Sequence, residues 1–487
     1  MRPLLVLLSL LLAAPALAGC LAGQQGAPAS PGPTASEYDA IEAAIGAPIN
    51  ESHDHNDPKL HQGKYNLERV AAVTGYADPA QEPPQTSFVE TAVKNGYAYV
   101  CRSGPDEGLV IFDVHDIEHP KQVGYVHLDA GFEPDVEVSD DGKWAFWETQ
   151  RLPGEGADPM DPTSAPGAAP YGIHLVDISD KAHPKWVGFT PVAPNGPHSI
   201  TYARIKGEDY VFAGVYSWQY VGTSVGTPTL APPMTQRLEI YKLDTSLPVA
   251  QLTEVASYID PDAANENPAT PQGGLMPHDV SITVHPITGK TYAYVAYWDL
   301  GVITLDVTDP AHPTKVSAFK DFGPAPYKEV HMARVFNHTI DGKVVMVVEP
   351  EIGGEPDSGY ITFADATDPA HVTYLSSWRI PGNITSQGGS LGPHYFDVLD
   401  GRVAMASYHA GFWVMDVHDH ANLMHPRTVA YAEVNATGQA LPGPAGGLGG
   451  GASAFDAWWA DETHVVGGDV HAGLVVFRYT GPAPAAV

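Results

Sequence analysis

Short runs of β-branched and aromatic residues recur along the chain, separated by clusters of Asp, Gly and Pro. The run "GLVIFDV" begins at residue 108, and similar runs begin at residues 172 and 301. Such runs are typical of β-strands. Each is followed by an Asp-containing cluster that ends in His-Pro, and then by a second apolar run. Because Asp accepts backbone hydrogen bonds and Pro fixes φ, these clusters predict turns between paired strands.

This strand–turn–strand unit is an internal repeat. Clear copies span 108–126, 172–190 and 301–319, looser copies span 359–378 and 411–431, and degenerate copies span 237–258 and 473–481. A hairpin precedes the unit, most plainly in "HDVSITVHPITGKTYAYVAYW", so each repeat has four strands. Four-stranded sheets repeated around an axis form a β-propeller. We therefore predict an all-β fold, a seven-bladed β-propeller of four-stranded blades over residues 65–481.

The seventh repeat ends one strand short. Residues 65–76 have the pattern of a fourth strand, with no hairpin before them. We predict that Leu67 to Thr74 completes the last blade, so that an N-terminal strand closes the ring and removes an exposed sheet edge. The alternative is a strand packed elsewhere.

Three of the strand runs also carry a family resemblance. "GLVIFDV", "IHLVDIS" and "VITLDVTDPAHP" resemble the LVIVD-repeat propellers of prokaryotic surface proteins, over about residues 65–480. The resemblance implies the propeller architecture and says little about activity. The third repeat departs most from the pattern, because it lacks the leading glycine and the Asp-Pro turn.

The chain contains 22 histidines, and some of them recur at one position of the repeat. Four stand at the head of the first strand of repeats three to six: His198, His278, His331 and His394. In a propeller the first strand lines the central channel, and the second strand ends at the face where the first begins. His409 and His471 end second strands, so all six are expected at one mouth of the channel. Histidines in turns, such as His312, or near hairpins, such as His285, are expected to be solvated.

This pattern favours a transition-metal site at that mouth. Neutral imidazole is a common ligand of copper, iron and zinc, and such sites use three or four ligands. Carboxylates near these strands would orient the imidazoles as outer partners: Asp279, Asp397, Glu349 and Asp299. The alternative is that each histidine only clips a neighbouring blade through a hydrogen bond. The arrangement is similar in geometry to the four-histidine iron centres of carotenoid-cleaving oxygenases, which are also propellers.

The N-terminal sequence predicts where the protein is located. Residues 1–20 have one arginine, an apolar run and then small residues, which indicates a secretory signal. Its end, "LAGC", resembles the lipobox of prokaryotic lipoproteins, which implies lipidation of Cys20 and an exported protein anchored to a membrane, at the cell surface or in the periplasm. The alternative is an ordinary signal peptide. Residues 21–50 are expected to be a flexible tether, and 482–487 form a short tail.

Residues 51–64 are rich in His and Asp. They would cap the far mouth of the channel, hold a separate ion, or remain a solvated segment. The formal net charge of −32 argues against nucleic acid as a partner. Acidic loops at 156–164 and 259–267 offer oxygen ligands for calcium, without an EF-hand pattern.

Two functions remain open. The first is a surface metalloprotein, an oxidoreductase or hydrolase that takes a small-molecule or protein ligand at the histidine-bearing face. The second is a non-enzymatic scaffold that binds protein, peptide or glycan through its long insertions. These insertions span 151–170, 215–236, 259–275 and 438–452. The metal hypothesis requires that four imidazoles, far apart along the chain, meet around one axis.

Overall fold

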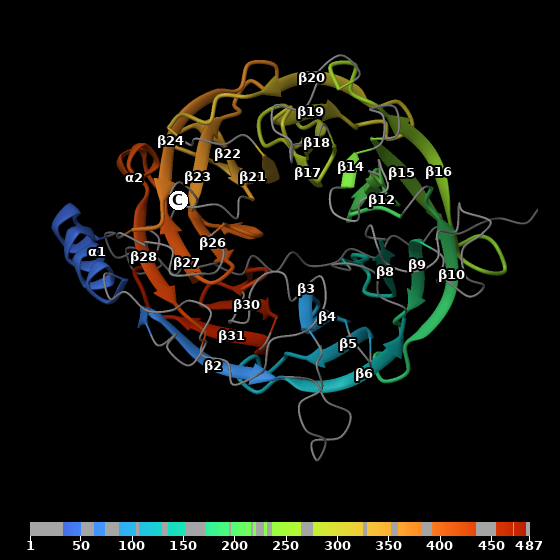
Figure 1. The fold of residues 1–487 in the computed structure, drawn as a ribbon, viewed down its shortest axis with the longest axis horizontal. Helices are drawn as coiled ribbons and strands as arrows, with labels where there is room; N and C mark the ends of the chain where they lie inside the picture. The colour runs from blue at the N-terminus through green and yellow to red at the C-terminus, as the bar shows by residue number, and fades with distance from the viewer. Residues whose placement is uncertain are drawn as a thin grey trace, which may run out of the picture.

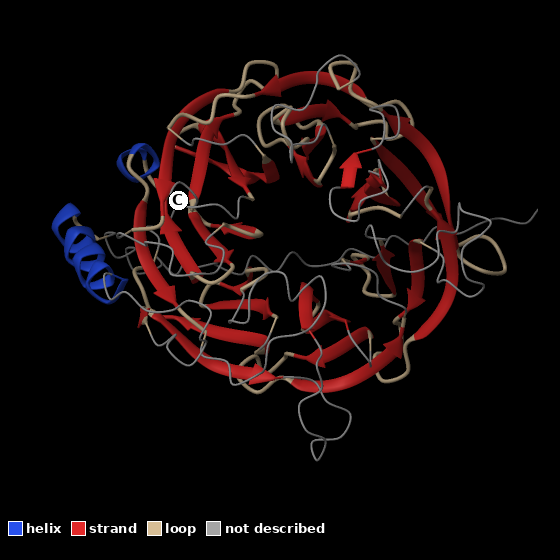
Figure 2. Ribbon diagram, in the orientation of Figure 1, coloured by secondary structure: helices blue, strands red, loops and turns tan. Residues whose placement is uncertain are grey.

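The protein folds as a seven-bladed β-propeller of four-stranded antiparallel blades (Figures 1 and 2), which confirms the predicted fold class. The computed structural model describes residues 33–49, 63–73, 87–103, 107–128, 135–150, 171–193, 196–215, 218–220, 228–230, 236–263, 276–324, 329–351, 359–381, 392–434, 454–470 and 472–483. The signal sequence, Cys20, the histidines of segment 51–64 and His471 lie outside these residues.

Blades one to four follow each other along the chain. Blade one contains β3 (Ser87–Lys94), β4 (Tyr97–Ser103), β5 (Gly108–Asp113) and β6 (Lys121–His127). Blade two contains β7 (Val136–Val138), β8 (Trp144–Thr149), β9 (Gly172–Asp177) and β10 (Lys185–Pro191). Blade three contains β11 (Ser199–Ile205), β12 (Glu208–Val215), β15 (Arg237–Asp244) and β16 (Gln251–Tyr258), and a small hairpin of β13 (Trp218–Tyr220) and β14 (Pro228–Leu230) interrupts it. Blade four contains β17 (Asp279–Val284), β18 (Thr291–Ala296), β19 (Val302–Asp306) and β20 (Thr314–Phe319).

The remaining blades complete the circle. Blade five contains β21 (Val330–Ile340), β22 (Lys343–Pro350), β23 (Tyr360–Asp365) and β24 (Thr373–Arg379). Blade six contains β25 (Phe396–Leu399), β26 (Arg402–Ser407), β27 (Gly411–Asp416), the short helix α2 (His420–Met424) and β28 (Arg427–Ala432), with β1 (Lys64–Tyr65) added at its outer edge. Blade seven contains β29 (Trp458–Asp461), β30 (His464–Asp469) and β31 (Gly473–Tyr479).

The hydrophobic core lies between neighbouring blades. Phe212 and Ile240 of blade three, for example, belong to one buried cluster with Ala293 and Val295 of blade four. The middle strands are buried on both faces, which explains why their sequences are continuous apolar runs. Cys101 is a free, fully buried residue of the cluster between blades one and two.

An N-terminal strand closes the ring, as predicted. Strand β2 (Leu67–Val73) pairs antiparallel with β31, from Leu67 opposite Tyr479 to Val73 opposite Leu474. In Figure 1 this blue strand lies at the outer edge of the red seventh blade. The side chain of Leu67 is 2% exposed, so the strand contributes to the core as well as to the sheet.

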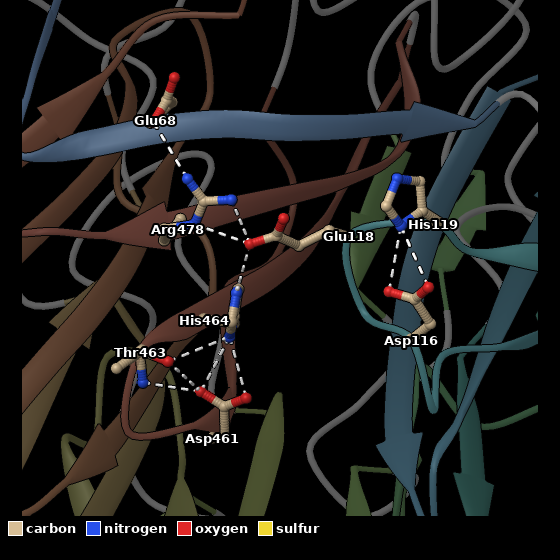
Figure 3. A network of polar contacts seen from close by, with 8 residues as sticks. All are labelled: Glu68, Asp116, Glu118, His119, Asp461, Thr463, His464 and Arg478. Carbon is tan, nitrogen blue, oxygen red and sulfur yellow. Dashed lines mark hydrogen bonds and ion pairs between the residues drawn. The ribbon is translucent and has the colours of Figure 1, made fainter.

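Side chains of three strands and one turn join at this closure (Figure 3). Glu118, in the turn before β6, accepts hydrogen bonds from the Arg478 guanidinium of β31, one of them 2.7 Å long from Nε. The Nε2 atom of His464 in β30 lies 3.4 Å from the same carboxylate, and Arg478 also reaches Glu68 of β2 at 3.4 Å. The network thus connects blade one to the N-terminal strand β2 and to the C-terminal strands β30 and β31, which together form blade seven. Since Arg478 is 40% exposed, its ion pairs stabilise the seam only weakly.

A buried carboxylate makes a second link between blades seven and one. Asp456 is fully buried and accepts hydrogen bonds from the Thr91 backbone N–H, at 2.5 Å, from the Trp458 indole, at 2.9 Å, and from the Gly468 backbone N–H. Burial raises the pKa of Asp456 to about 7, against its ordinary value of 3.8.

This raised pKa predicts a pH dependence of stability. A carboxyl group with a higher pKa in the folded protein contributes stability that is fully present below its unfolded pKa and is lost as pH rises through its folded pKa. We expect the free energy of unfolding to fall between about pH 4 and pH 7, and the Asp456→Asn variant to show a shallower fall over that interval. Urea titrations at several pH values measure both slopes. Equal slopes in the two proteins would contradict the assignment.

Residues 35–49 differ from the expected flexible tether of residues 21–50. They form helix α1 (Ala35–Ile49), which packs against blade six. Thr34 and Glu37 form one half of a capping box, in which the Thr34 backbone N–H donates to Glu37 Oε2 at 2.6 Å. Tyr38 is buried and donates to Asp416 Oδ2 at 2.7 Å. Neither helix in the described part of the chain is long and apolar enough to cross a membrane.

Candidate metal centre

The four predicted histidines occupy equivalent positions at the heads of first strands. The backbone N–H of His198 donates to Gly214 O at 2.8 Å. The N–H of His278 donates to Ala296 O at 2.7 Å, and that of His394 to Ala406 O at 2.9 Å. Each acceptor stands at the end of its blade's second strand, and His331 lies at the start of β21. The shared register therefore brings the rings to one height in the channel.

The four imidazoles form a continuous row. Ring centroids lie 4.2 Å apart for His198 and His278, 4.3 Å for His278 and His331, and 4.4 Å for His331 and His394. All four side chains are buried, and His331 is 0% exposed. The geometric requirement of the metal hypothesis is thus met by residues that span almost 200 positions of sequence.

The middle of this row has the strongest ligand geometry. Ligand atoms of His278, His331 and Glu351 lie within 4.8 Å of one another, and Nε2 of His278 lies 3.8 Å from Glu351 Oε2. Neither ring nitrogen of His331 makes a hydrogen bond with a described residue, although Nδ1 is 3.2 Å from Glu349 Oε1. A buried polar side chain without hydrogen bonds is costly. An ion bound by His331 would remove that cost.

The two outer histidines are held by acceptors behind them. His198 Nδ1 lies 2.8 Å from Gln150 Oε1, and His394 Nδ1 lies 2.7 Å from the Phe455 carbonyl oxygen. A carbonyl oxygen can only accept, so Nδ1 carries the proton and Nε2 presents a lone pair. Backing of this kind is characteristic of metal-ligating histidines.

The His198–His278 pair shows a compatible spacing. Their Nε2 atoms are 2.9 Å apart. Two nitrogens bound to one ion at about 2.0–2.1 Å lie roughly 2.9–3.4 Å from each other, depending on the coordination angle. Burial lowers the pKa of His198 to about 3, and burial together with the neighbouring imidazoles lowers the pKa of His278 and of His394 well below the ordinary value. The rings are therefore neutral at pH 7, as ligation requires.

Aromatic side chains with unusual backbone geometry enclose the row. Trp298 stacks on His278 with centroids 4.8 Å apart, Tyr395 contacts His331 at 4.7 Å, and Tyr408 contacts His394 at 5.0 Å. These three residues have φ values of 43°, 54° and 27°. Bulky residues rarely adopt positive φ, and such strain concentrates at functional sites. Tyr408 also donates to Glu351 Oε1 at 2.5 Å, so the aromatic shell and the carboxylate are connected.

The structure distributes the four expected outer carboxylates differently. Glu349 is fully buried beside His331 and accepts the Tyr395 N–H at 3.1 Å. Asp279 instead lines a cavity deeper in the channel. Asp397 pairs with Arg334 at 2.6 Å and accepts the Trp459 N–H, which places it one layer below the imidazoles. Asp299 lies in the turn after Trp298.

Other histidines divide between turns and core. His409 is fully buried in the turn after Tyr408, outside the group formed with Glu351. His312 is exposed and pairs with Asp309 at 2.9 Å, as expected for a turn histidine. The expectation for His285 is wrong. It is fully buried, its Nδ1 accepts the Thr288 N–H at 3.1 Å, and its Nε2 donates to the Ala366 carbonyl oxygen at 3.0 Å.

Two residues of the site are not among the predicted ones. Glu351 follows Glu349 by two positions in "VVEPEIG", and Gln150 ends the second strand of blade two in "WETQ". The rule that second-strand ends reach the histidine-bearing face covers both.

The fold defines the class of protein, a seven-bladed β-propeller, and comparison refines it. The chain carries LVIVD repeats, matched at residues 90–127 and 287–321. No curated protein matches the sequence. Similar solved structures include the Cps50 (Swd1) β-propeller domain of Myceliophteria thermophila, with 10% identity and a TM-score of 0.45 over 85% of this chain and 99% of that one. Another is the WD40 β-propeller domain of Doa1, with 11% identity and a TM-score of 0.46 over 86% and 97%.

Proposed function

We propose that this LVIVD-repeat propeller is a metalloprotein that binds one transition-metal ion, copper, iron or zinc, at the row of histidines. His278, His331 and Glu351 are the central ligands, and His198 and His394 flank them. The observation that carries the proposal is His331, whose fully buried imidazole has no hydrogen bond to a described residue and stands between two other imidazoles.

The inter-blade clip is a weaker explanation of the same residues. A clip requires a hydrogen bond from each ring to a neighbouring blade, and two rings make one, His198 to Gln150 and His394 to Phe455. His331 makes none with the described residues. Four clips would also not require a carboxylate beside the row, whereas a cation is stabilised by Glu351.

The chemistry of such a centre follows from its surroundings. The bound ion would supply Lewis-acid or redox chemistry to a small molecule at the channel mouth. Tyr408 would hold Glu351 in place and exchange a proton with it, since their oxygens are 2.5 Å apart. We therefore propose a metal-dependent oxidoreductase as the first activity to assay, with hydrolase activity as the second.

The N-terminal sequence supports an exported, lipid-anchored protein. We propose that lipidation of Cys20 attaches the propeller to a membrane at the cell surface or in the periplasm. For calcium, the described part of the 259–267 loop offers less support. Asp260 and Asp262 lie there within 2.9 Å and 2.7 Å of Lys315 Nζ, so both carboxylates already have a cationic partner.

Metal analysis of natively purified protein tests the proposal. We expect close to one equivalent of copper, iron or zinc per chain, removable by a chelator and restored by adding one of these ions. Binding should also raise the midpoint of thermal unfolding, since the ion binds only the folded state. A metal-free protein that rebinds none of the three ions, with an unchanged unfolding midpoint, would end the proposal and favour a binding scaffold.

A further inference from the structure

A cavity lies in the central channel, one layer below the histidine row. Its volume is about 280 Å³, and all seven first strands contribute to its wall. Residues directly following the histidines form its upper side: Asp279 after His278, Met332 after His331 and Tyr395 after His394. The cavity therefore adjoins the candidate metal centre without sharing its ligands.

The wall of this cavity carries an excess of negative charge. Five carboxylates line it, from Glu90, Asp135, Glu137, Asp279 and Asp397. Its two cationic side chains already have partners, because Lys94 pairs with Asp140 at 2.5 Å and Arg334 with Asp397 at 2.6 Å. The carboxylates of Asp135, Glu137 and Asp279 have no lysine or arginine within 4.0 Å among the described residues.

Asp279 indicates more specifically that this wall can bind a cation. Its side chain is 6% exposed and lines the cavity. The Val280 N–H of its own strand donates to Oδ1, and Oδ2 has no hydrogen-bond partner in the described part of the chain. A buried carboxylate is normally paired or fully hydrogen-bonded, because its desolvation is expensive. A positively charged group in the cavity would supply the missing partner.

The arrangement does not suit a bare metal ion. Within the described residues, only His278, His331 and Glu351 bring three ligand atoms within 4.8 Å of one another. The cavity carboxylates are more dispersed than that, and the space exceeds that of one ion. Tyr395, Trp458 and Trp459 also line the cavity, and aromatic faces attract organic cations. Arg334 already stacks on Trp458, with Cζ 4.9 Å from the ring centroid.

We propose that this cavity binds a small aliphatic amine in its ammonium form, with a diamine pairing with carboxylates of two blades. Glu137 of blade two and Asp279 of blade four are the primary partners. The site is independent of the metal centre and would exist in metal-free protein.

The proposed amine binding should be coupled to proton release. Burial raises the pKa of Glu137 to about 7, so without a bound amine this group is partly protonated at neutral pH. An ammonium group favours the carboxylate form and expels that proton. Binding should therefore release protons and strengthen as pH rises from about 6 to 8.

Calorimetric titration of chelator-treated, full-length protein with butane-1,4-diamine tests the proposal. We expect saturable 1:1 binding, with no binding of the uncharged analogue butan-1-ol. Glu137→Gln and Asp279→Asn should each weaken the diamine by at least about 10-fold, since each removes one charged hydrogen bond. Glu254→Gln, on the exposed outer strand β16, is the matched control and should leave affinity unchanged.

Thermal unfolding of the same variants guards against a merely structural effect. Without diamine, Glu137→Gln should unfold at the same or a higher temperature than wild type, because it removes a half-buried charge that pairs with no lysine or arginine of the described residues within 4.0 Å. Several outcomes would overturn the proposal: no diamine binding, equal binding of butan-1-ol, or binding of calcium or magnesium in place of the diamine. Loss of diamine binding in His331→Leu would also overturn it, by placing the amine at the metal centre.

Discussion

Replacement of His331 by leucine is expected to lower metal affinity by more than about 100-fold while the propeller remains folded. Even loss of a residue that only orients a ligand costs about 10–100-fold, so loss of the central ligand should cost more. Leucine fills most of the ring's volume and has no polar atom to bury. Because His331 has no hydrogen bond to a described residue, the metal-free variant should be as stable as metal-free wild type, or more so. Competition titrations with a chromophoric chelator measure the affinity.

The matched control for this variant is His312→Leu. His312 is exposed in a turn and pairs only with Asp309 of the same turn, so its loss should leave metal affinity unchanged. If His331 were an inter-blade clip, the pattern would reverse. His331→Leu would then lower the free energy of unfolding in the absence of metal and leave metal content unaltered.

Glu351 offers a separate test of the ligand set. In the Tyr408→Phe variant the carboxylate loses its hydrogen bond from the phenol, and its geometry is less restricted. A modest loss of affinity, of about 10-fold, is expected for a partner that positions a ligand. The Tyr395→Phe variant is a suitable comparison, because Tyr395 also contacts His394 but has no hydrogen bond to Glu351.

The propeller fold could be predicted because the same strand and turn pattern recurs in the sequence of each blade. Each blade reuses the same apolar run and the same Asp-containing turn, so that one weak strand signal is confirmed several times over, as at residues 108, 172 and 301. Helix α1 was missed for the opposite reason. It occurs once, within a Gly- and Pro-rich stretch, and its capping box at Thr34 and Glu37 is a short local signal.

The candidate site was predictable to the level of strand position. Equivalent registers place His198, His278, His331 and His394 at one height, and the structure brings them together. The strand register does not specify which layer of the channel a side chain near the end of a strand faces. Asp279 and Asp397 follow their histidines in sequence yet line the cavity below, and Glu351 joins the site from the position directly after β22.

Two charge environments are therefore stacked in one channel. The upper layer holds neutral imidazoles, whose pKa values are lowered by burial, and the lower layer holds carboxylates, of which Glu137 has its pKa raised by burial. In each layer, burying polar or charged side chains without partners costs free energy. A metal ion would offset this cost in the upper layer and an organic ammonium group in the lower layer. The propeller can carry both because its blades are held rigidly by the closure of the ring.

That closure predicts a large effect of removing β2. Deletion of residues 1–73 should lower the free energy of unfolding by roughly 5 kcal/mol, from the lost β2–β31 ladder and the lost burial of Leu67. It would also expose β31 as an open edge, so light scattering should detect aggregation. Deletion of residues 1–62 is the control, since it removes α1 but keeps β2, and this protein should stay monodisperse. A synthetic peptide of residues 63–76, added to the protein that lacks residues 1–73, should restore its stability and prevent its aggregation. Equal stability and solubility of the two deletions would show that the seventh blade is held by its own three strands, and that the seam around Glu118 and Asp456 suffices to close the ring.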